Sequence, residues 1–144
     1  MTRRIMLSQI GDYATDRYEQ LLRATVLETD SRLKQGSPVD TGRFRASWQV
    51  SENSTAAGQK PPGDYAITPI ERIAYQDERV GNVYHVHNNL PYAEPLAGGP
   101  SFPPSWKAAG VTGSKQAPAG WVDLIAREMT AWVQQQADRI GRQR

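Results

Sequence analysis

The most extended hydrophobic pattern in the first part of the chain has a helical period. Apolar and small positions recur at three- and four-residue spacing between Gly11 and Gln35: Tyr18, Leu21, Leu22, Thr25, Val26, Thr29 and Leu33. This spacing places them on one stripe of a helix. Gly36 is a suitable C-cap and Pro38 cannot continue a helix. The pattern predicts a long helix over 11–35.

Two later segments alternate with a period of two. In 47–51, Trp48 and Val50 share one face while polar residues occupy the other, which predicts a half-buried strand. The segment 82–88 predicts a second strand, with Tyr84 and Val86 on one face. The opposite face of that strand carries Val83, His85 and His87.

Helical signals return at the end of the chain. A wide apolar stripe between Pro118 and Ile140 predicts a second long helix, comprising Trp121, Val122, Leu124, Ile125, Met129, Trp132 and Val133. Three short helical turns are also expected: one capped by Asp40 or Thr41, one starting at 68–70, and one over 92–97. The element order predicts one α+β domain over 1–144, a small antiparallel sheet packed by long N- and C-terminal helices.

Two long stretches lack any period. Residues 52–63 are polar and rich in Gly and Pro, and loops of this length are typically functional or disordered. Residues 100–115 contain Phe102 and Trp106 and are too apolar for an ordinary solvated loop. We expect 52–60, 100–115 and the Arg-rich C-terminus to become ordered against a neighbouring subunit. Residues 1–8 and 141–144 are expected to be flexible tails.

Aromatic composition adds an interface hypothesis. The chain has four Trp and only two Phe, and Trp is enriched at protein–protein interfaces. We expect one of Trp106, Trp121 or Trp132 to lie at a contact between subunits. Phe102 and Trp106 are the preferred candidates because no periodic pattern places them in the core.

Composition excludes several classes of protein. The 144 residues contain no Cys, which rules out disulfides and thiolate zinc sites. No apolar run approaches the roughly 20 residues that span a bilayer, and no signal-peptide pattern follows the first charged residues. The net charge of +2 comes from well-mixed residues. The sequence therefore predicts a soluble protein made in a cytoplasm, without a membrane partner.

The candidate chemistry in the sequence is sparse. His85 and His87 lie on the same side of the second predicted strand, as two metal ligands would, but a zinc site needs a third protein ligand. Hydrogen-bonding surface residues are the commoner interpretation, and a small metal-dependent nuclease is kept as the alternative function. A DNA-binding accessory protein is a third hypothesis, which would use the terminal arginines: Arg3, Arg4, Arg139, Arg142 and Arg144.

The pair Asn88–Asn89 precedes Pro91 and Tyr92. Asn side chains satisfy nearby backbone groups and tolerate turn geometry. We therefore interpret both as turn residues rather than ligand-binding residues. Tyr92 is equally well explained by packing and by an interface.

Three blocks of sequence together carry a family resemblance. The first block is 37–48 (SPVDTGRFRASW), the second is 84–94 (YHVHNNLPYAE) and the third is 116–120 (QAPAG). In this order they resemble the tail-completion, or head–tail joining, proteins of long-tailed bacteriophages. The stretch 100–115 departs from that pattern, because relatives pass more directly from the short helix to the third block.

The resemblance implies a structural protein of the virion that is not an enzyme and has no cofactor or metal. It implies an α+β fold, assembly into rings that are commonly hexameric, and a place at the neck. Its partners would be a tail terminator or tail tube protein and the head connector or stopper proteins, with non-specific contact to passing DNA. The residues expected at subunit or partner contacts are Asp40, Arg43, Tyr92, Phe102, Trp106 and Gln116.

Overall fold

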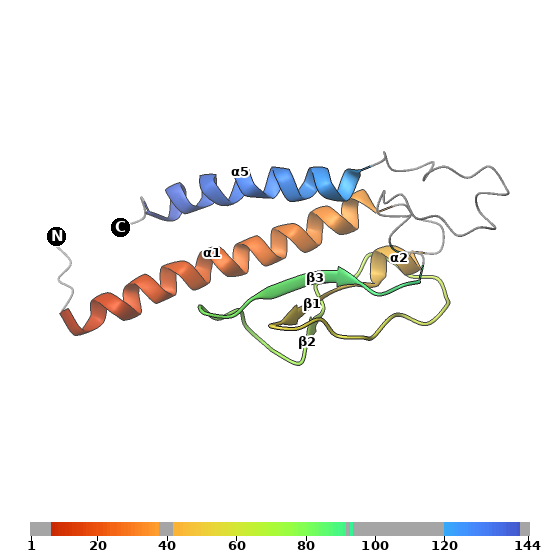
Figure 1. Cartoon of the computed structure of the whole chain (residues 1–144), viewed down its shortest axis with the longest axis horizontal. Coiled ribbons are helices and arrows are strands. Elements are labelled where there is room, and N and C mark those ends of the chain that lie inside the picture. The colour runs from red at the N-terminus through yellow and green to blue at the C-terminus, as the bar shows by residue number, and fades with distance from the viewer. Residues whose placement is uncertain (1–6, 38–41, 92, 94–119, 142–144) are drawn as a thin grey trace.

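The structure is a computed structural model that describes residues 7–37, 42–91, 93 and 120–141. The elements in chain order are α1 (Leu7–Gly36), α2 (Arg43–Ala46), β1 (Trp48–Glu52), β2 (Arg72–Ile73), β3 (Tyr84–Asn88) and α5 (Trp121–Gly141). Figure 1 shows α1 lying between α5 on one side and the small sheet on the other. The arrangement is the α+β fold that the element order predicts.

The two long helices form where the apolar stripes predict them. Helix α1 begins at Leu7, four residues before its predicted start, and ends at Gly36, the residue predicted to cap it. A Cβ atom on Gly36 would lie 3.0 Å from the Trp121 Cε3 atom. The glycine therefore lets the first turn of α5 pack directly on the last turn of α1.

The sheet has three strands in the order β2-β1-β3 and is mixed rather than antiparallel. Strands β1 and β3 are antiparallel, with Gln49 opposite His87 and Val50 opposite Val86. Strands β1 and β2 are parallel, with Val50 opposite Arg72. The prediction of an antiparallel sheet is wrong for this second pair, because the connection between β1 and β2 is long enough to return the chain in the same direction.

The expected helix start at 68–70 is also wrong. Residues 68–71 form no helix and lead directly into β2. The backbone amide of Val50 donates to the carbonyl of Glu71, and Lys34 from α1 bonds to the carbonyls of Thr68 and Pro69. These tertiary contacts use backbone acceptors of the segment and override the local preference of the Thr-Pro pair for a helix N-terminus.

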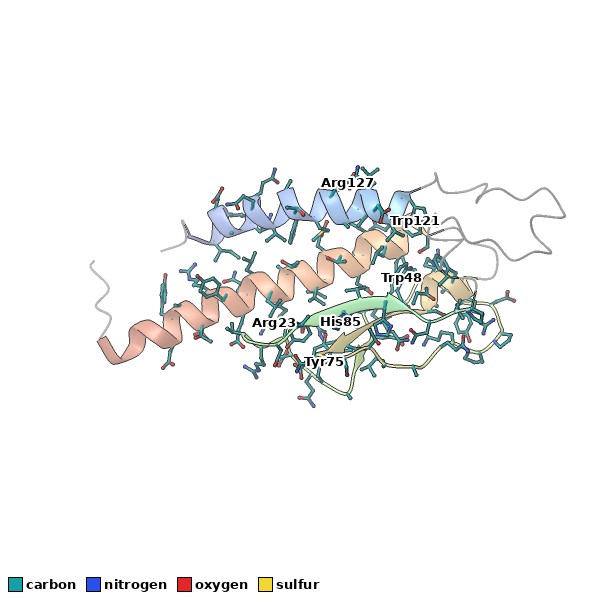
Figure 2. All side chains as sticks on the ribbon, viewed as in Figure 1. Arg23, Trp48, Tyr75, His85, Trp121 and Arg127 are labelled. Carbon is teal, nitrogen blue, oxygen red and sulfur yellow. The ribbon has the colours of Figure 1, made fainter. Side chains whose placement is uncertain are left out.

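The main hydrophobic cluster lies at one end of the molecule. Phe44, Trp48 and Trp121 pack edge to face, with ring centroids 5.6–6.5 Å apart, and Leu33 and Leu90 complete the cluster. Figure 2 shows Trp121 at the start of α5 and Trp48 near α2, on the same side of the molecule. The indole nitrogen of Trp48 donates to Ser37 at 2.9 Å.

Trp121 is 4 % exposed, so it is a core residue and not a contact between subunits. Two members of the predicted stripes are instead exposed, Tyr18 at 65 % and Leu124 at 51 %.

Part of the predicted organisation lies outside the described residues, including the short helix beyond residue 93, the 100–115 stretch and most of both tails. Residues 7 and 8, predicted to be tail, belong to α1, and Gly141 belongs to α5. Within the described ranges, no helix combines the length and apolarity needed to cross a membrane.

Candidate functional site

Of the six residues expected at subunit or partner contacts, only Arg43 lies in the described part of the chain. It starts α2, is half-buried, and donates from Nε to the Lys60 carbonyl at 2.8 Å. The other five lie outside the described residues: Asp40, Tyr92, Phe102, Trp106 and Gln116. The candidate site is therefore built from the segment that Arg43 holds, the β1–β2 loop (residues 53–71).

Strand β1 is buried on both faces, which contradicts the prediction of a half-buried strand. Trp48 and Val50 lie in the apolar interior, at 5 % and 0 % exposure. Gln49 and Ser51, on the opposite face, are just as buried at 6 % and 3 %. The Gln49 side chain donates to the Gly58 carbonyl and Ser51 Oγ accepts from the Ala56 amide, so the β1–β2 loop covers this polar face.

The β1–β2 loop is fixed to the rest of the chain through its own backbone carbonyls. These carbonyls accept hydrogen bonds from side chains of α1, α2, β1 and the end of β3. The side chains thus supply the partners that loop carbonyls do not find in a helix or sheet. The donors are Lys34, Arg43, Arg45, Gln49 and Asn89, and the acceptors are the carbonyls of Ala56, Gly58, Lys60, Tyr65, Thr68 and Pro69. The expectation that 52–60 becomes ordered only against a neighbouring subunit is therefore wrong.

Gly42 sets the entrance to this region. Its φ of 84° is in the left-handed range, and a Cβ atom there would lie 2.0 Å from the Tyr65 carbonyl oxygen. Only glycine meets both conditions without strain. The glycine of the first sequence block thus allows the chain to pass directly beneath the loop.

A closed hydrogen-bond circuit joins the loop to β1 and β3. The Asn89 amide nitrogen donates to the carbonyls of Ala56 and Gly58, at 2.6 and 2.8 Å, which leaves its Oδ1 atom to accept from His87 Nδ1 at 3.2 Å. His87 Nε2 is then an acceptor for the Ser51 hydroxyl at 2.6 Å, and Ser51 Oγ accepts from the Ala56 amide at 3.1 Å. This assignment of protons follows from the donors and acceptors available, and the circuit starts and ends at Ala56.

The circuit bears on the chemistry expected of the two histidines. Both ring nitrogens of His87 have hydrogen-bond partners, and His85 Nε2 lies 3.4 Å from the Asn53 carbonyl. Within the described ranges, no three or more His, Cys, Asp or Glu side chains are grouped as metal ligands. Ser51, His87 and Asn89 stand in the order of a nucleophile, base and orienting residue. Residue Ser51 is nevertheless only 3 % exposed and is covered by the loop, so the arrangement favours holding the loop over attacking a substrate.

The turn prediction is confirmed for Asn88, whereas the Asn89 side chain bonds to the distant β1–β2 loop and to His87. Asn88 accepts from the Leu90 amide at 3.2 Å, which is the expected turn contact, and donates to the Phe44 carbonyl at 2.8 Å. The second contact joins α2 to β3. Asn88 therefore fixes both the turn after β3 and the position of α2.

Two buried ion pairs lie between α1 and the β2 edge of the sheet. Lys34 is 2 % exposed, and its ammonium group lies 2.9 Å from the Asp30 carboxylate while donating to two loop carbonyls. Glu78 is completely buried and accepts from the Arg72 guanidinium at 2.9–3.2 Å. Buried pairs of this kind contribute more to a unique arrangement than to net stability, because desolvation offsets the Coulomb attraction.

These surroundings change the protonation equilibria of nearby groups. Burial raises the pKa of the Asp30 carboxyl above its ordinary value, although the bond to Lys34 acts in the opposite direction. Burial, followed by the Glu78 carboxylate, raises the pKa of Tyr75 to about 12. The Glu78–Arg72 contact also raises the pKa of Arg72. The interior beside β2 therefore disfavours additional negative charge.

Sequence reasoning missed the residues that organise this region. Lys34 falls within the predicted first helix but outside its apolar stripe, where a solvated lysine is the ordinary expectation. Glu78 and Arg72 are six residues apart in an irregular segment, which has no spacing rule. The sequence carries one indication of this region. The polar face of β1, opposite the two histidines, is followed by an uncommonly long loop.

Comparisons of the chain with protein-family models, curated proteins and solved structures find no match.

Proposed function

We propose that this chain is a structural protein of a long-tailed bacteriophage that completes the tail and helps join it to the head. It acts as a ring at the neck, commonly of six copies, and is not an enzyme. Its neighbours are a tail terminator or tail tube protein and the connector or stopper proteins of the head. It is made in the cytoplasm of the bacterial host and resides in the virion.

The observation that carries this proposal is where the described residues of the first two resemblance blocks lie relative to Trp121. Phe44 and Trp48 of the first block pack against Trp121, which follows the third block directly. Asn88 of the second block bonds to Phe44, and Leu90 belongs to the same hydrophobic cluster. The described parts of the first two blocks, together with Trp121, thus shape the core end of the molecule.

The β1–β2 loop supports an assembly role. Its inner side is fastened by side chains of the scaffold, whereas most residues of 53–67 are exposed, including Ile67 at 56 %. A loop held in one conformation loses little conformational entropy when a neighbour binds it. Such a loop suits repeated, identical contacts in a ring, whose closed symmetry requires the same surface on every copy.

The proposed place at the neck also defines its contact with DNA. Residues that line a central channel would meet the passing genome through weak contacts to phosphates rather than through base recognition. The described part of the chain has no metal-ligand group on which to base the nuclease alternative. No cofactor is part of the proposal.

The test is to delete the gene from the phage genome that encodes it and to image the lysate by negative-stain electron microscopy. Filled heads beside separate or malformed tails are the expected result. Normally joined virions would overturn the proposal. In that case, metal-dependent cleavage of DNA by wild-type protein and by a His85→Ala, His87→Ala double variant is the next measurement.

A further inference from the structure

Strand β3 lies at the outside of the sheet, so only one of its two edges pairs with β1. The sheet order β2-β1-β3 gives β3 a single neighbouring strand. The Asn53 amide donates to the Val83 carbonyl at 2.6 Å, so these two residues are a hydrogen-bonded pair of the antiparallel ladder. The Val50 amide donates instead to the carbonyl of Glu71, next to β2, which agrees with this alternation.

The alternation decides which backbone groups of β3 are bonded. Hydrogen-bonded pairs occur at every second residue of an antiparallel ladder, so His85 and His87 exchange backbone hydrogen bonds with β1. The backbone N–H and C=O groups of Tyr84, Val86 and Asn88 therefore point away from β1, toward the outer edge. No residue in the described ranges bonds to these outward groups. An open edge of this kind is a template for a further strand.

The two outer edges of the sheet differ in how they resist such pairing. Natural sheets blunt their edges with very short strands, proline or lysine. Strand β2 has two residues and closely follows Pro69. Strand β3 has five residues, and its sequence YHVHN contains no Pro, Lys, Arg, Asp or Glu. The β3 edge therefore lacks the protection that the β2 edge has.

The two faces of β3 are already used within the chain. Val86 packs against the main hydrophobic cluster, which includes Leu33 of α1. On the other face, His87 belongs to the hydrogen-bond circuit that holds the β1–β2 loop. All residues of β3 are nevertheless partly exposed. Among the residues that the structure describes, nothing pairs with the outer edge, so the edge is the part of β3 that a partner strand fits.

We infer that β3 pairs with β3 of a second copy of this chain. The two strands run antiparallel about a two-fold axis at Val86, so that Val86 lies opposite its equivalent and Tyr84 lies opposite Asn88 of the second copy. Each of these pairs exchanges two backbone hydrogen bonds, which gives roughly six bonds across the interface. The two sheets become one continuous sheet, and the contact is isologous because both copies use the same surface.

A second copy is the occupant that the edge itself matches. Donors and acceptors alternate along a strand edge, so an identical strand in the opposite direction satisfies all of them. Identical strands also bring identical charges together, and the absence of Lys, Arg, Asp and Glu from 84–88 removes that source of repulsion. The inference does not depend on a role in a phage neck, and a ring would need a further contact elsewhere.

Amide hydrogen exchange at two protein concentrations tests the edge directly. In dilute monomer, the amides of Tyr84, Val86 and Asn88 are expected to exchange freely, whereas β1 protects those of His85 and His87. Where sedimentation equilibrium shows a dimer, both sets of amides are expected to be protected. Free exchange of the outward amides in a dimer would place the contact elsewhere. Their protection in a monomer would show that the chain covers its own edge, and either result overturns the inference.

A lysine on the edge strand tests the same contact with a matched control. His85→Lys is expected to raise the dimer dissociation constant at least about tenfold, because lysine blocks edge pairing and the second copy brings another lysine to the same face. Thr55→Lys adds the same charge at an exposed position of the β1–β2 loop and is expected to change the constant less than about twofold. Equal dissociation constants for the two variants would contradict pairing through β3.

The oligomeric state of the wild-type chain separates this inference from the proposed function. A wild-type chain that stays monomeric up to roughly 0.5 mM overturns the inference. The neck proposal would still stand, since the imaging of deletion lysates tests that proposal separately.

Discussion

The two faces of β1 are equally buried but are covered by different chemistry. One face presents Trp48 and Val50 to α1, α2 and the aromatic cluster, where packing needs no hydrogen-bond partners beyond the Trp48 indole. The opposite face presents Gln49 and Ser51 to the β1–β2 loop, where each polar group has a partner. On the first face, close packing of apolar side chains excludes water. On the second face, hydrogen bonds to the loop replace those that water would make.

The difference has an energetic consequence. Removing apolar volume costs transfer free energy plus a cavity, which makes the aromatic face the main source of stability. Removing one member of the buried hydrogen-bond circuit leaves its partner without a hydrogen bond, which costs about 1–3 kcal/mol of stability. This change loosens only the β1–β2 loop that the circuit holds in place. We therefore expect mutations on the two faces to separate global stability from the anchoring of the loop.

The largest effect is expected for Trp48→Ala. The substitution removes the ring that contacts both Phe44 and Trp121 and is expected to lower the free energy of unfolding by about 3–5 kcal/mol. Chemical denaturation of wild type and variant measures the change. A loss below about 1 kcal/mol would show that the aromatic cluster is not the principal core.

The next effect concerns the buried ion pair. Lys34→Met leaves the Asp30 carboxylate buried without its cation, and a loss of about 3–5 kcal/mol is expected. The double variant Asp30→Leu, Lys34→Met removes both charges and is expected to be considerably more stable than the single variant. If denaturation midpoints of single and double variants coincide, the pair is not coupled as the structure indicates.

A smaller and local effect is expected for Asn89→Ala. It removes the donor to two loop carbonyls and the acceptor for His87, with an expected cost of about 1–3 kcal/mol. Amide hydrogen exchange should accelerate in 54–60 while α1 stays protected. Thr55→Ala, an exposed change in the same loop, is the control. Uniform acceleration across both regions would contradict separate anchoring of the loop.

The smallest effect is on the alkaline limit of stability. Because burial raises the pKa of Tyr75 from 10.0 to about 12, the folded state keeps this phenol protonated where the unfolded state does not. The contribution of Tyr75 is complete below pH 10 and is lost as the pH rises toward 12. Tyr75→Phe should reduce this alkaline fall in denaturation midpoint, whereas Tyr18→Phe, at an exposed position, should leave it unchanged.

Periodicity predicted the two long helices and two of the strands because their apolar residues recur at the spacing of a helix stripe or at alternate strand positions. Alternation could not show that Gln49 and Ser51 are buried, since a polar residue is buried only when a distant segment supplies its partners. The direction of β2 was likewise unpredictable, because it depends on the path of a loop fixed by Lys34, Arg43 and Asn89. The turn role of Asn88 was predictable because it is largely local.

Complementation in vitro shows directly whether this protein joins heads to tails. A lysate of phage lacking this gene supplies heads and tails, and purified protein is added before infectious particles are counted. Wild-type protein is expected to raise the count by several orders of magnitude, and the destabilised Trp48→Ala variant is expected to raise it far less. If wild-type protein is folded, as judged by circular dichroism, and the number of infectious particles still does not rise, a role in joining heads to tails is contradicted.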